Sequence, residues 1–490
     1  MAVTAYIFWL ALAEIFFYIS GFIVQSAAGR ILGPADYGVY GLIITLTILI
    51  ASLIGNGIPI AMSKFLSADL KKNPEMIPAI KRKGAIAQFI LMTFVTLIFF
   101  VSAPLIAKIL HDPSLTRLLR IGTLIIPCFA ADAFYFYYYT GVHQFNMQSL
   151  LKTLRSFLRV AIIVGLGYFL SLEGFITGYI YVPLAVFIIA FIIDKFVYSR
   201  RFPKSSKKIN FPIKKIVAYA LPVTGFLVLY QTMISLNLFV VKSMLQNDYL
   251  TGLFNGAFTI AQIPNYLFYA LTIILLPIVS HSSANEHREK TAQTITKALR
   301  MMTLLLLPTI ALIIGYARPL MIFFFGAKFS EGSVALQPMA FGLGLLTLFY
   351  VMSFAFQGAG LVKTPLKVAF FGMLLNVTLN IFFVRTYGII GSGIATSITA
   401  VFVTIALLFL LKKDFGSYLP MSTYVKMIFA SLVVFVLTFI LPGQKMLFIV
   451  SGGFLYLLYM GILFALKELS MDDIAMLKSM IPGIRKKRSI

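Results

Sequence analysis

Long apolar segments, separated by short polar ones, constrain this sequence more than any other feature. Segments of about 20 apolar residues are long enough to cross a bilayer as a helix, and they recur about fourteen times in the 490 residues. Because 60% of the residues are hydrophobic and 12% are charged, a water-soluble fold would leave much apolar surface exposed. We therefore predict an all-α polytopic membrane protein with about fourteen transmembrane helices. The expected helices cover residues 5–29, 38–63, 84–110, 115–141, 149–170, 174–197, 216–241, 250–279, 292–316, 334–359, 364–386, 391–411, 421–441 and 446–466.

The distribution of charge predicts how the chain crosses the membrane. The net charge is +25, and most basic residues fall in the connections on one side of the expected helices, in clusters such as Lys81–Lys83 and Arg485–Arg488. Cytoplasmic loops are enriched in Lys and Arg, and anionic headgroups attract such clusters. We therefore expect a multi-pass protein of the cell membrane with both termini in the cytoplasm, a retained first helix, membrane lipids as partners and no nucleic acid.

Two distant stretches resemble each other and indicate an internal duplication. The segments Arg30–Tyr40 and Lys242–Phe254 each place a cation six residues before an Asp-Tyr pair and continue with a Gly-aliphatic-aromatic triplet, about 212 residues apart. An even number of helices separates the copies, so they share one orientation across the membrane. The pattern predicts two six-helix lobes related by a parallel pseudo-twofold repeat, plus two extra helices. Gly38 and Gly252 are expected to shape turns.

The repeat and the composition also divide the chain. A Pro-broken, strongly basic stretch separates the two copies and is too charged to be buried. After the last apolar segment, apolar residues recur at helical spacing ahead of the basic tail, as in a helix that lies on a membrane surface. The expected divisions are an N-terminal six-helix lobe (1–198), a basic cytoplasmic linker (199–215), a C-terminal six-helix lobe (216–413), two additional transmembrane helices (414–468), and a cytoplasmic amphipathic helix with a basic tail (469–490).

Charged residues inside the expected helices are the best candidates for function, because a charge at the bilayer centre costs several kcal/mol unless it is paired or hydrated. Arg155 and Arg159 lie on one face of the fifth helix with Lys152, and they are predicted to bind an anion, since guanidinium groups grip phosphate bidentately. We expect Lys152 to snorkel to the surface, and Arg155 has the same alternative. Asp132 is either a cation site or the counter-ion of Arg159. Glu14 is either a cation or proton site or a hydrogen-bonded structural acid.

Four further polar positions fall at equivalent places in the two copies. Arg30 and Lys242 lie at the outer ends of the first and seventh helices and are expected to line the mouth of a cavity as anion-binding residues; the alternative is a pair of interfacial anchors. Gln25 and Asn237 precede them in the same helices. They are expected to be polar cavity residues or to hydrogen-bond between helices.

The sequence offers little for catalysis. The single Cys, Cys128, lies in an apolar run, and the four His residues show no zinc-binding spacing. Glycosyl transfer or polymerisation usually needs positioned carboxylates or a metal, and only 16 residues are acidic. We therefore expect no enzyme, no catalytic residues, no metal site and no cofactor.

The segments Gly29–Tyr40, Gly57–Phe65 and Phe356–Gly360 resemble the signature of the polysaccharide transporter family. This family of the multidrug/oligosaccharidyl-lipid/polysaccharide exporter superfamily includes O-antigen-type flippases and stage V sporulation protein B-like proteins. The resemblance implies two lobes around a V-shaped cavity whose cationic surface holds the pyrophosphate and glycan of a lipid-linked oligosaccharide. In the second lobe, the corresponding helix offers the polar residues Asn376 and Asn380 in place of cations.

The resemblance and the buried arginines together favour one function. We expect a flippase that moves a polyprenyl-(pyro)phosphate-linked oligosaccharide from the cytoplasmic to the outer leaflet by alternating access, for cell-surface polysaccharide or glycan assembly, with glycan-assembly enzymes as candidate partners. One alternative is a cation-coupled multidrug antiporter, in which Glu14 and Asp132 would carry the cations. The other is a lipid II flippase, which the absence of cations from the interior of the second helix disfavours.

Overall fold

The computed structural model describes residues 2–198, 211–268, 279, 288–441, 443 and 446–469, and the described residues are helical apart from short connections. Most of the expected linker (199–210), part of the eighth expected helix (269–278) and nearly all of the expected C-terminal helix and tail (470–490) lie outside the described residues. The chain packs into two compact units, which are described separately. Unit 1 comprises Met1–Thr259 and Pro365–Ala395, and unit 2 comprises Ile260–Thr364 and Thr396–Ile490.

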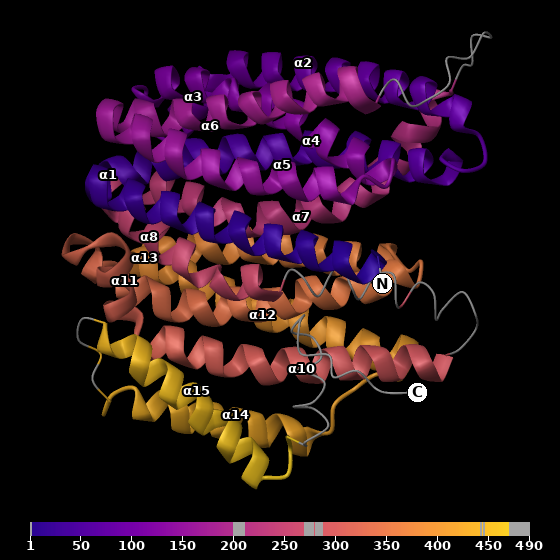
Figure 1. Ribbon diagram of the computed structural model, residues 1–490. Helices are drawn as coiled ribbons and strands as arrows, with labels where there is room; N and C mark the ends of the chain where they lie inside the picture. Colours follow the sequence, from indigo (N-terminus) through magenta and orange to yellow (C-terminus); the bar gives the residue numbers. More distant parts are fainter. Residues whose placement is uncertain are drawn as a thin grey trace. The chain divides into compact units, whose positions relative to one another are not determined.

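Unit 1 contains most of the first half of the chain (Figure 1). Its helices are α1 (Ala2–Asp69), α2 (Ile77–Ile109), α3 (Leu115–Thr123), α4 (Ile125–Gly141), α5 (Phe145–Leu158), α6 (Gly165–Ile193), α7 (Ile213–Leu245), most of α8 (Asp248–Ala261) and the middle of α13 (Lys363–Phe415). A six-residue π-helix, Arg159–Val164, joins α5 to α6. The helices α1, α4, α5 and α6 pack against one another and surround the charged residues predicted from the sequence.

Unit 2 contains the remaining helices, and its core is apolar. It includes α10 (Arg288–Gly315), α11 (Ala317–Phe325), α12 (Ser333–Gly358), α14 (Met421–Leu437) and α15 (Leu447–Ala465), with both ends of α13. The buried side chains of α10, α14 and α15 form one cluster that includes Met427, Leu455 and Tyr459. The two helices predicted as additional spans therefore pack onto α10.

Nine helical segments in the described part of the chain are long and apolar enough to cross a membrane, which confirms an all-α multi-pass membrane protein. Several of these segments hold two of the expected spans. The backbone of α1 leaves helical geometry at Gly33, between the first and second expected spans, and α13 does so at Gly388. The number fourteen stays a prediction.

Backbone conformation carries the same duplication as the sequence. Within the described residues, eight positions with a left-handed φ fall into four pairs, whose members lie about 215 residues apart at corresponding helix ends. The pairs are Gly33 with Gln246, His111 with Gly326, His143 with Gly360, and Ser171 with Gly388. Glycine adopts this conformation without strain and other residues do so rarely. The repeat therefore includes the turns between helices as well as the helices themselves.

The compact units do not follow the predicted lobes. Helix α7, which begins the second repeat, packs against α1, and Asn380 of α13 donates a hydrogen bond to Asn237 of α7. Unit 1 therefore includes α7, most of α8 and the middle of α13, which belong to the second repeat. The division into lobes 1–198 and 216–413 stays a prediction.

Candidate functional site

Four of the five charged residues predicted inside the helices of the first repeat form two buried ion pairs. Lys152 of α5 pairs with Glu14 of α1, and Arg155 pairs with Asp132 of α4, with 2.5 Å between its Nη1 and the Oδ2 of Asp132. Only 6% of the Asp132 side chain and 19% of the Arg155 side chain are exposed. A buried ion costs several kcal/mol unless it is paired. Each carboxylate therefore offsets the cost of burying the cation beside it.

The three cations of the cluster lie around one aromatic ring. The charged groups of Lys152, Arg155 and Arg159 lie 5.2, 5.4 and 5.2 Å from the centroid of the Phe17 ring. A cation over an aromatic face gains electrostatic stabilisation, most where water is excluded. The face predicted from the spacing of the three cations is therefore present, and Phe17, which the sequence analysis did not single out, lies at its centre.

Arg159 lies at the start of a π-helix and contacts α6 and α1. It begins the π-helix Arg159–Val164, a wider turn that often marks functional sites. Its guanidinium donates to the Tyr179 hydroxyl at 3.4 Å, and that hydroxyl lies 3.1 Å from the hydroxyl of Tyr40. A Cβ on Gly21 would come within 2.7 Å of Arg159 Nη1, so the glycine leaves space for the guanidinium.

Two interpretations from the sequence need correction. Asp132, expected to be either a cation site or the counter-ion of Arg159, is the counter-ion of Arg155. The prediction that Lys152 snorkels is wrong, because 12% of its side chain is exposed and it pairs with Glu14. Its ammonium also faces the rings of Phe17 and Phe136, each centroid 5.2 Å away. Pairing within the helix bundle satisfies Lys152 where it lies, so its side chain has no need to reach the surface.

Lys242 and Arg30, predicted as equivalent cavity cations, have different environments. Lys242 is 3% exposed and donates to Asp112 at 2.9 Å and to Asp248 at 2.5 Å, whereas Arg30 is exposed. Burial raises the pKa of Asp112, but hydrogen bonds from Ser114 and Lys242 outweigh burial, and the pKa lies below its ordinary value. Lys242 thus links the α7–α8 hairpin to the connection between α2 and α3 through its ion pairs. It does not line the open mouth of a cavity.

The predicted polar residues of the second repeat form a buried hydrogen-bond network. The side-chain amide of Asn380 donates to Asn237 Oδ1 at 3.0 Å and to Asn376 Oδ1 at 3.1 Å. Its own Oδ1 accepts a hydrogen bond from Ser392 at 2.6 Å. All four side chains are buried. For Asn237, the alternative of a hydrogen bond between helices is therefore favoured over exposure to a cavity, and Asn376 and Asn380, predicted as polar cavity residues, are buried in the same network.

The duplicated motifs meet at a close helix crossing within unit 1. A Cβ on Gly38 of α1 would lie 2.8 Å from the Gly252 nitrogen of α8, and a Cβ on Gly252 would overlap the Pro34 carbonyl oxygen. Gly38 and Gly252 lie inside helices, so the expectation that they shape turns is wrong. Beside them, the Tyr37 hydroxyl donates to Gln25 at 3.0 Å, which gives Gln25 a bond between the two halves of α1.

Comparison with known proteins assigns the chain to a family. The model of the family described as "Polysaccharide biosynthesis protein" matches residues 3–283, more than half of the chain. The chain belongs to this family. Its relatives include the stage V sporulation protein B of Bacillus subtilis, 21% identical over 83% of this chain and 82% of that protein. They also include the probable lipid II flippase MurJ of Vibrio cholerae, 30% identical over 34% of this chain and 33% of that protein.

Solved structures share the fold of this member of the polysaccharide biosynthesis protein family. A lipid II flippase MurJ in an inward closed conformation superimposes with a TM-score of 0.75 at 19% identity, covering 93% of this chain and 98% of that one. An inward-facing MATE transporter superimposes with a TM-score of 0.68 at 18% identity, covering 81% of this chain and 94% of that one. At these identities, the likeness concerns the fold.

The charged cluster gives this family member a basic site within an apolar bundle. The five side chains comprise three cations and two carboxylates, so they carry a net formal charge of +1. Two of the cations are guanidinium groups, which stay charged at low dielectric and match the geometry of phosphate oxygens. The arrangement suits binding of an anionic group.

Proposed function

We propose that the protein is a flippase for a polyprenyl-(pyro)phosphate-linked oligosaccharide. It would carry this lipid from the cytoplasmic to the outer leaflet by alternating access, with both chain termini in the cytoplasm. Membership in the polysaccharide biosynthesis protein family supports the substrate class. We further propose that the repeats 1–198 and 216–413 are the lobes that move, and that glycan-assembly enzymes supply the substrate at the cytoplasmic face.

One observation carries this proposal, namely the row of Lys152, Arg155 and Arg159 gathered around Phe17. A row of cations inside a membrane protein is costly, and binding an anionic headgroup gives it a reason to persist. In the proposed mechanism, Arg159 makes bidentate contact with a phosphate, and Arg155, tied to Asp132, contributes to the positive potential. Arg30, exposed at the outer end of the first span, would contact the headgroup during release.

The state of the two buried acids supports a flippase over a cation-coupled antiporter. An antiporter needs carboxylates that exchange protons or metal cations, and here Glu14 and Asp132 are each engaged by a basic side chain of α5. A coupling cation would have to displace Lys152 or Arg155 from its ion pair. We therefore assign Glu14 and Asp132 the role of counter-ions.

Translocation in liposomes tests the proposal. A fluorescent polyprenyl-pyrophosphate oligosaccharide is placed in one leaflet, and its appearance in the other is followed for wild type, Arg159→Ala and Arg159→Lys. We expect Arg159→Ala to abolish translocation and Arg159→Lys to recover little, because an ammonium cannot make the bidentate contact. Arg117→Ala is the matched control, since the Arg117 side chain is 75% exposed and pairs with Glu173 at the surface.

Three results would contradict the proposal or part of it. Normal translocation by Arg159→Ala would remove the assigned site. Translocation of lipid II in preference to the oligosaccharide lipid would change the substrate to that of the MurJ relatives. Inactivity on both lipids, together with proton- or sodium-driven efflux of organic cations, would favour the antiporter.

A further inference from the structure

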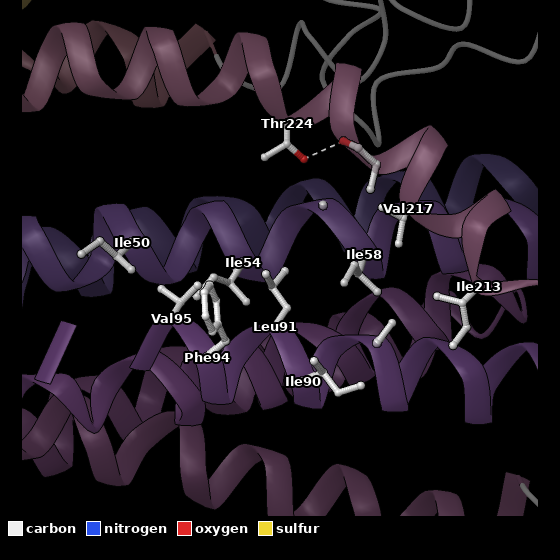
Figure 2. A pocket seen from close by; sticks show the side chains of 13 residues that line it. Ile50, Ile54, Ile58, Ile90, Leu91, Phe94, Val95, Ile213, Val217 and Thr224 are labelled. Atoms are coloured by element: carbon white, nitrogen blue, oxygen red, sulfur yellow. Dashed lines mark hydrogen bonds between the residues drawn. The ribbon is translucent and has the colours of Figure 1, made fainter. Parts of the chain in front are cut away.

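An apolar groove of about 550 Å³ lies in unit 1, and no residue of the charged cluster lines it. Its walls come from the second half of α1, the first half of α2 and the first turns of α7, whose side chains Figure 2 shows. Ile54, Ile58 and Ala220 are buried at its base, whereas Ile90 and Phe94 on α2 are each 61% exposed. The groove therefore opens toward the outside of the helix bundle, where the surroundings of a membrane protein are lipid.

The lining favours a hydrocarbon occupant. Thr224 is the one hydroxyl-bearing residue among the lining residues, and its hydroxyl donates to the Ala220 carbonyl of its own helix at 2.7 Å (Figure 2). A polar ligand would lose its hydration in this groove and find no hydrogen bond in return, at a cost of several kcal/mol. A saturated acyl chain pays no such desolvation cost, because the bilayer interior that it leaves is also hydrocarbon.

The length of the groove matches one leaflet. Its wall on α7 runs from Ile213 to Thr224, which at 1.5 Å per residue is about 16 Å. Half of a hydrocarbon core about 30 Å thick is about 15 Å. An acyl chain of one leaflet fills such a groove, whereas a long polyprenyl chain would extend well beyond it.

One end of the groove is basic. The rings of Phe65, near the end of α1, and Phe211, just before α7, lie with their centroids 5.3 Å apart. The same hydrophobic cluster includes Ile77 of α2 and Ile216 of α7, so the end of α1 and the starts of α2 and α7 share one end of the groove. Lys83 lies one turn before Ala87 on α2, and the exposed Lys214 lies one turn before Val217 on α7. Both cations belong to the face predicted to be cytoplasmic.

We propose that this groove binds an acyl chain of an anionic phospholipid from the leaflet at its basic end, with Lys83 and Lys214 contacting the phosphate. The groove joins the second and third expected spans to α7, the first helix of the second repeat. A lipid held there would favour whichever conformation keeps α7 against α1 and α2, because a ligand shifts an equilibrium toward the state that it binds. The site concerns bulk lipid and is independent of the transported substrate.

Photolabelling of the full-length protein in nanodiscs tests the proposal. The probe is phosphatidylglycerol with a photoactivatable group in its acyl chain, compared with a matching phosphatidylcholine probe and with polyprenyl phosphate as competitor. We expect the phosphatidylglycerol probe to label the segments of α2 and α7 that line the groove. A Lys or Arg near an anionic surface contributes enough binding free energy to change affinity about fivefold, so Lys83→Gln and Lys214→Gln should each weaken labelling about that much.

Two further variants make the result decisive. Lys413→Gln removes an exposed charge from unit 2 and should leave labelling unchanged. Ala220→Trp fills the base of the groove and should abolish labelling by both probes; the two lysine variants still test the site if this variant fails to fold. Equal labelling by phosphatidylcholine, no effect of either lysine, or displacement of the probe by polyprenyl phosphate would each overturn the proposal. None of these measurements depends on flippase activity.

Discussion

The two repeats share their backbone and differ in the chemistry of their interiors. Ser171 and Gly388 adopt nearly the same unusual conformation, with φ of 52° and 61° and ψ of −131° and −139°. At the same repeat spacings, the buried charged residues around Phe17 in the first repeat correspond to uncharged ones in the second. Glu14 corresponds to Phe226, Asp132 to Phe349, Arg155 to Gly372 and Arg159 to Asn376.

This difference indicates where the duplicated fold acquired its specialised site. Phe226 and Phe349 are buried, so the second repeat has packed aromatic side chains at the positions where the first repeat has the carboxylates of its ion pairs. Replacing a buried ion pair by apolar residues is often neutral or stabilising. The first repeat therefore retains its charges at some expense in stability, which is expected of residues kept for binding.

The largest expected effect comes from breaking one ion pair of the first repeat. Arg155→Ala leaves the Asp132 carboxylate buried without its cation, and we expect this to lower the free energy of unfolding by about 3–5 kcal/mol. Unfolding in mixed micelles measures the loss. The double variant Arg155→Met with Asp132→Leu makes the site apolar, as in the second repeat, and should recover most of the stability while translocation stays impaired.

The double variant distinguishes a role of the Asp132–Arg155 pair in translocation from a role in packing alone. Recovery of both stability and translocation would mean that the Asp132–Arg155 pair serves packing alone. If the double variant is as unstable as Arg155→Ala, the unpaired carboxylate is not the cause of the loss. Leu432→Ala, at an exposed position of α14, is a control for substitution of a side chain on the surface of the bundle.

The sequence predicted the fold better than it predicted which charged residues form ion pairs with each other. The length of the apolar segments and the duplicated Asp-Tyr motif were sufficient to predict an all-α membrane protein with a parallel repeat, because each signal is read from a short stretch of sequence. The spacing of Lys152, Arg155 and Arg159 predicted a common face. Their partners depend on how α1 and α4 pack beside α5, which no local pattern encodes. The alternative that Asp132 is a counter-ion therefore named Arg159, whereas the partner is Arg155.

Residues without charge were harder to find. Phe17 is one of 47 phenylalanines, and nothing in the sequence around it distinguishes it from the others. Its role is visible only in the structure, where three cations lie around its ring.

The environments of Lys242 and Arg30 could not be predicted either. The two residues are equivalent in sequence, but Lys242 has Asp112 beside it from a distant connection. Signals within the sequence were available for the Lys242–Asp248 pair, since the six-residue spacing occurs in both repeats.

The helix crossing that joins the repeats should be the next most sensitive feature. Gly252→Ala places a methyl group against the Pro34 carbonyl, and backbone atoms cannot turn aside as a flexible side chain can. We expect a loss of about 3 kcal/mol, at the upper end for overpacking, in the free energy of unfolding. Gly453→Ala in α15, where a Cβ would meet nothing within 4 Å, is the matched control. Equal effects of the two substitutions would contradict close packing at the crossing.

The amide network of the second repeat should contribute less than the ion pairs of the first. Asn380→Ala removes the bonds to Asn237, Asn376 and Ser392. Hydrogen bonds between membrane helices average about 0.6 kcal/mol and reach about 1.7 kcal/mol. Because the bonds to Asn376 and Ser392 within α13 are lost with the bond to α7, we expect a loss of about 2 kcal/mol in the free energy of unfolding. Thr378→Ala, whose exposed hydroxyl bonds only to its own helix in the described contacts, should change little. A loss as large as that of Arg155→Ala would remove the contrast between the repeats.

The smallest predicted effect tests the backbone itself. Ser171 has the left-handed φ that its counterpart Gly388 adopts without strain, and such strain costs about 1–3 kcal/mol for a residue with a side chain. Ser171→Gly should therefore raise the free energy of unfolding by about 1 kcal/mol, after allowance for the greater freedom of glycine in the unfolded chain. Gly388→Ser should lower it by a similar amount, measured in the same micelles. Because the two turns share one geometry, opposite signs are required: two losses would mean that the Ser171 side chain stabilises its turn through contacts that the second repeat lacks.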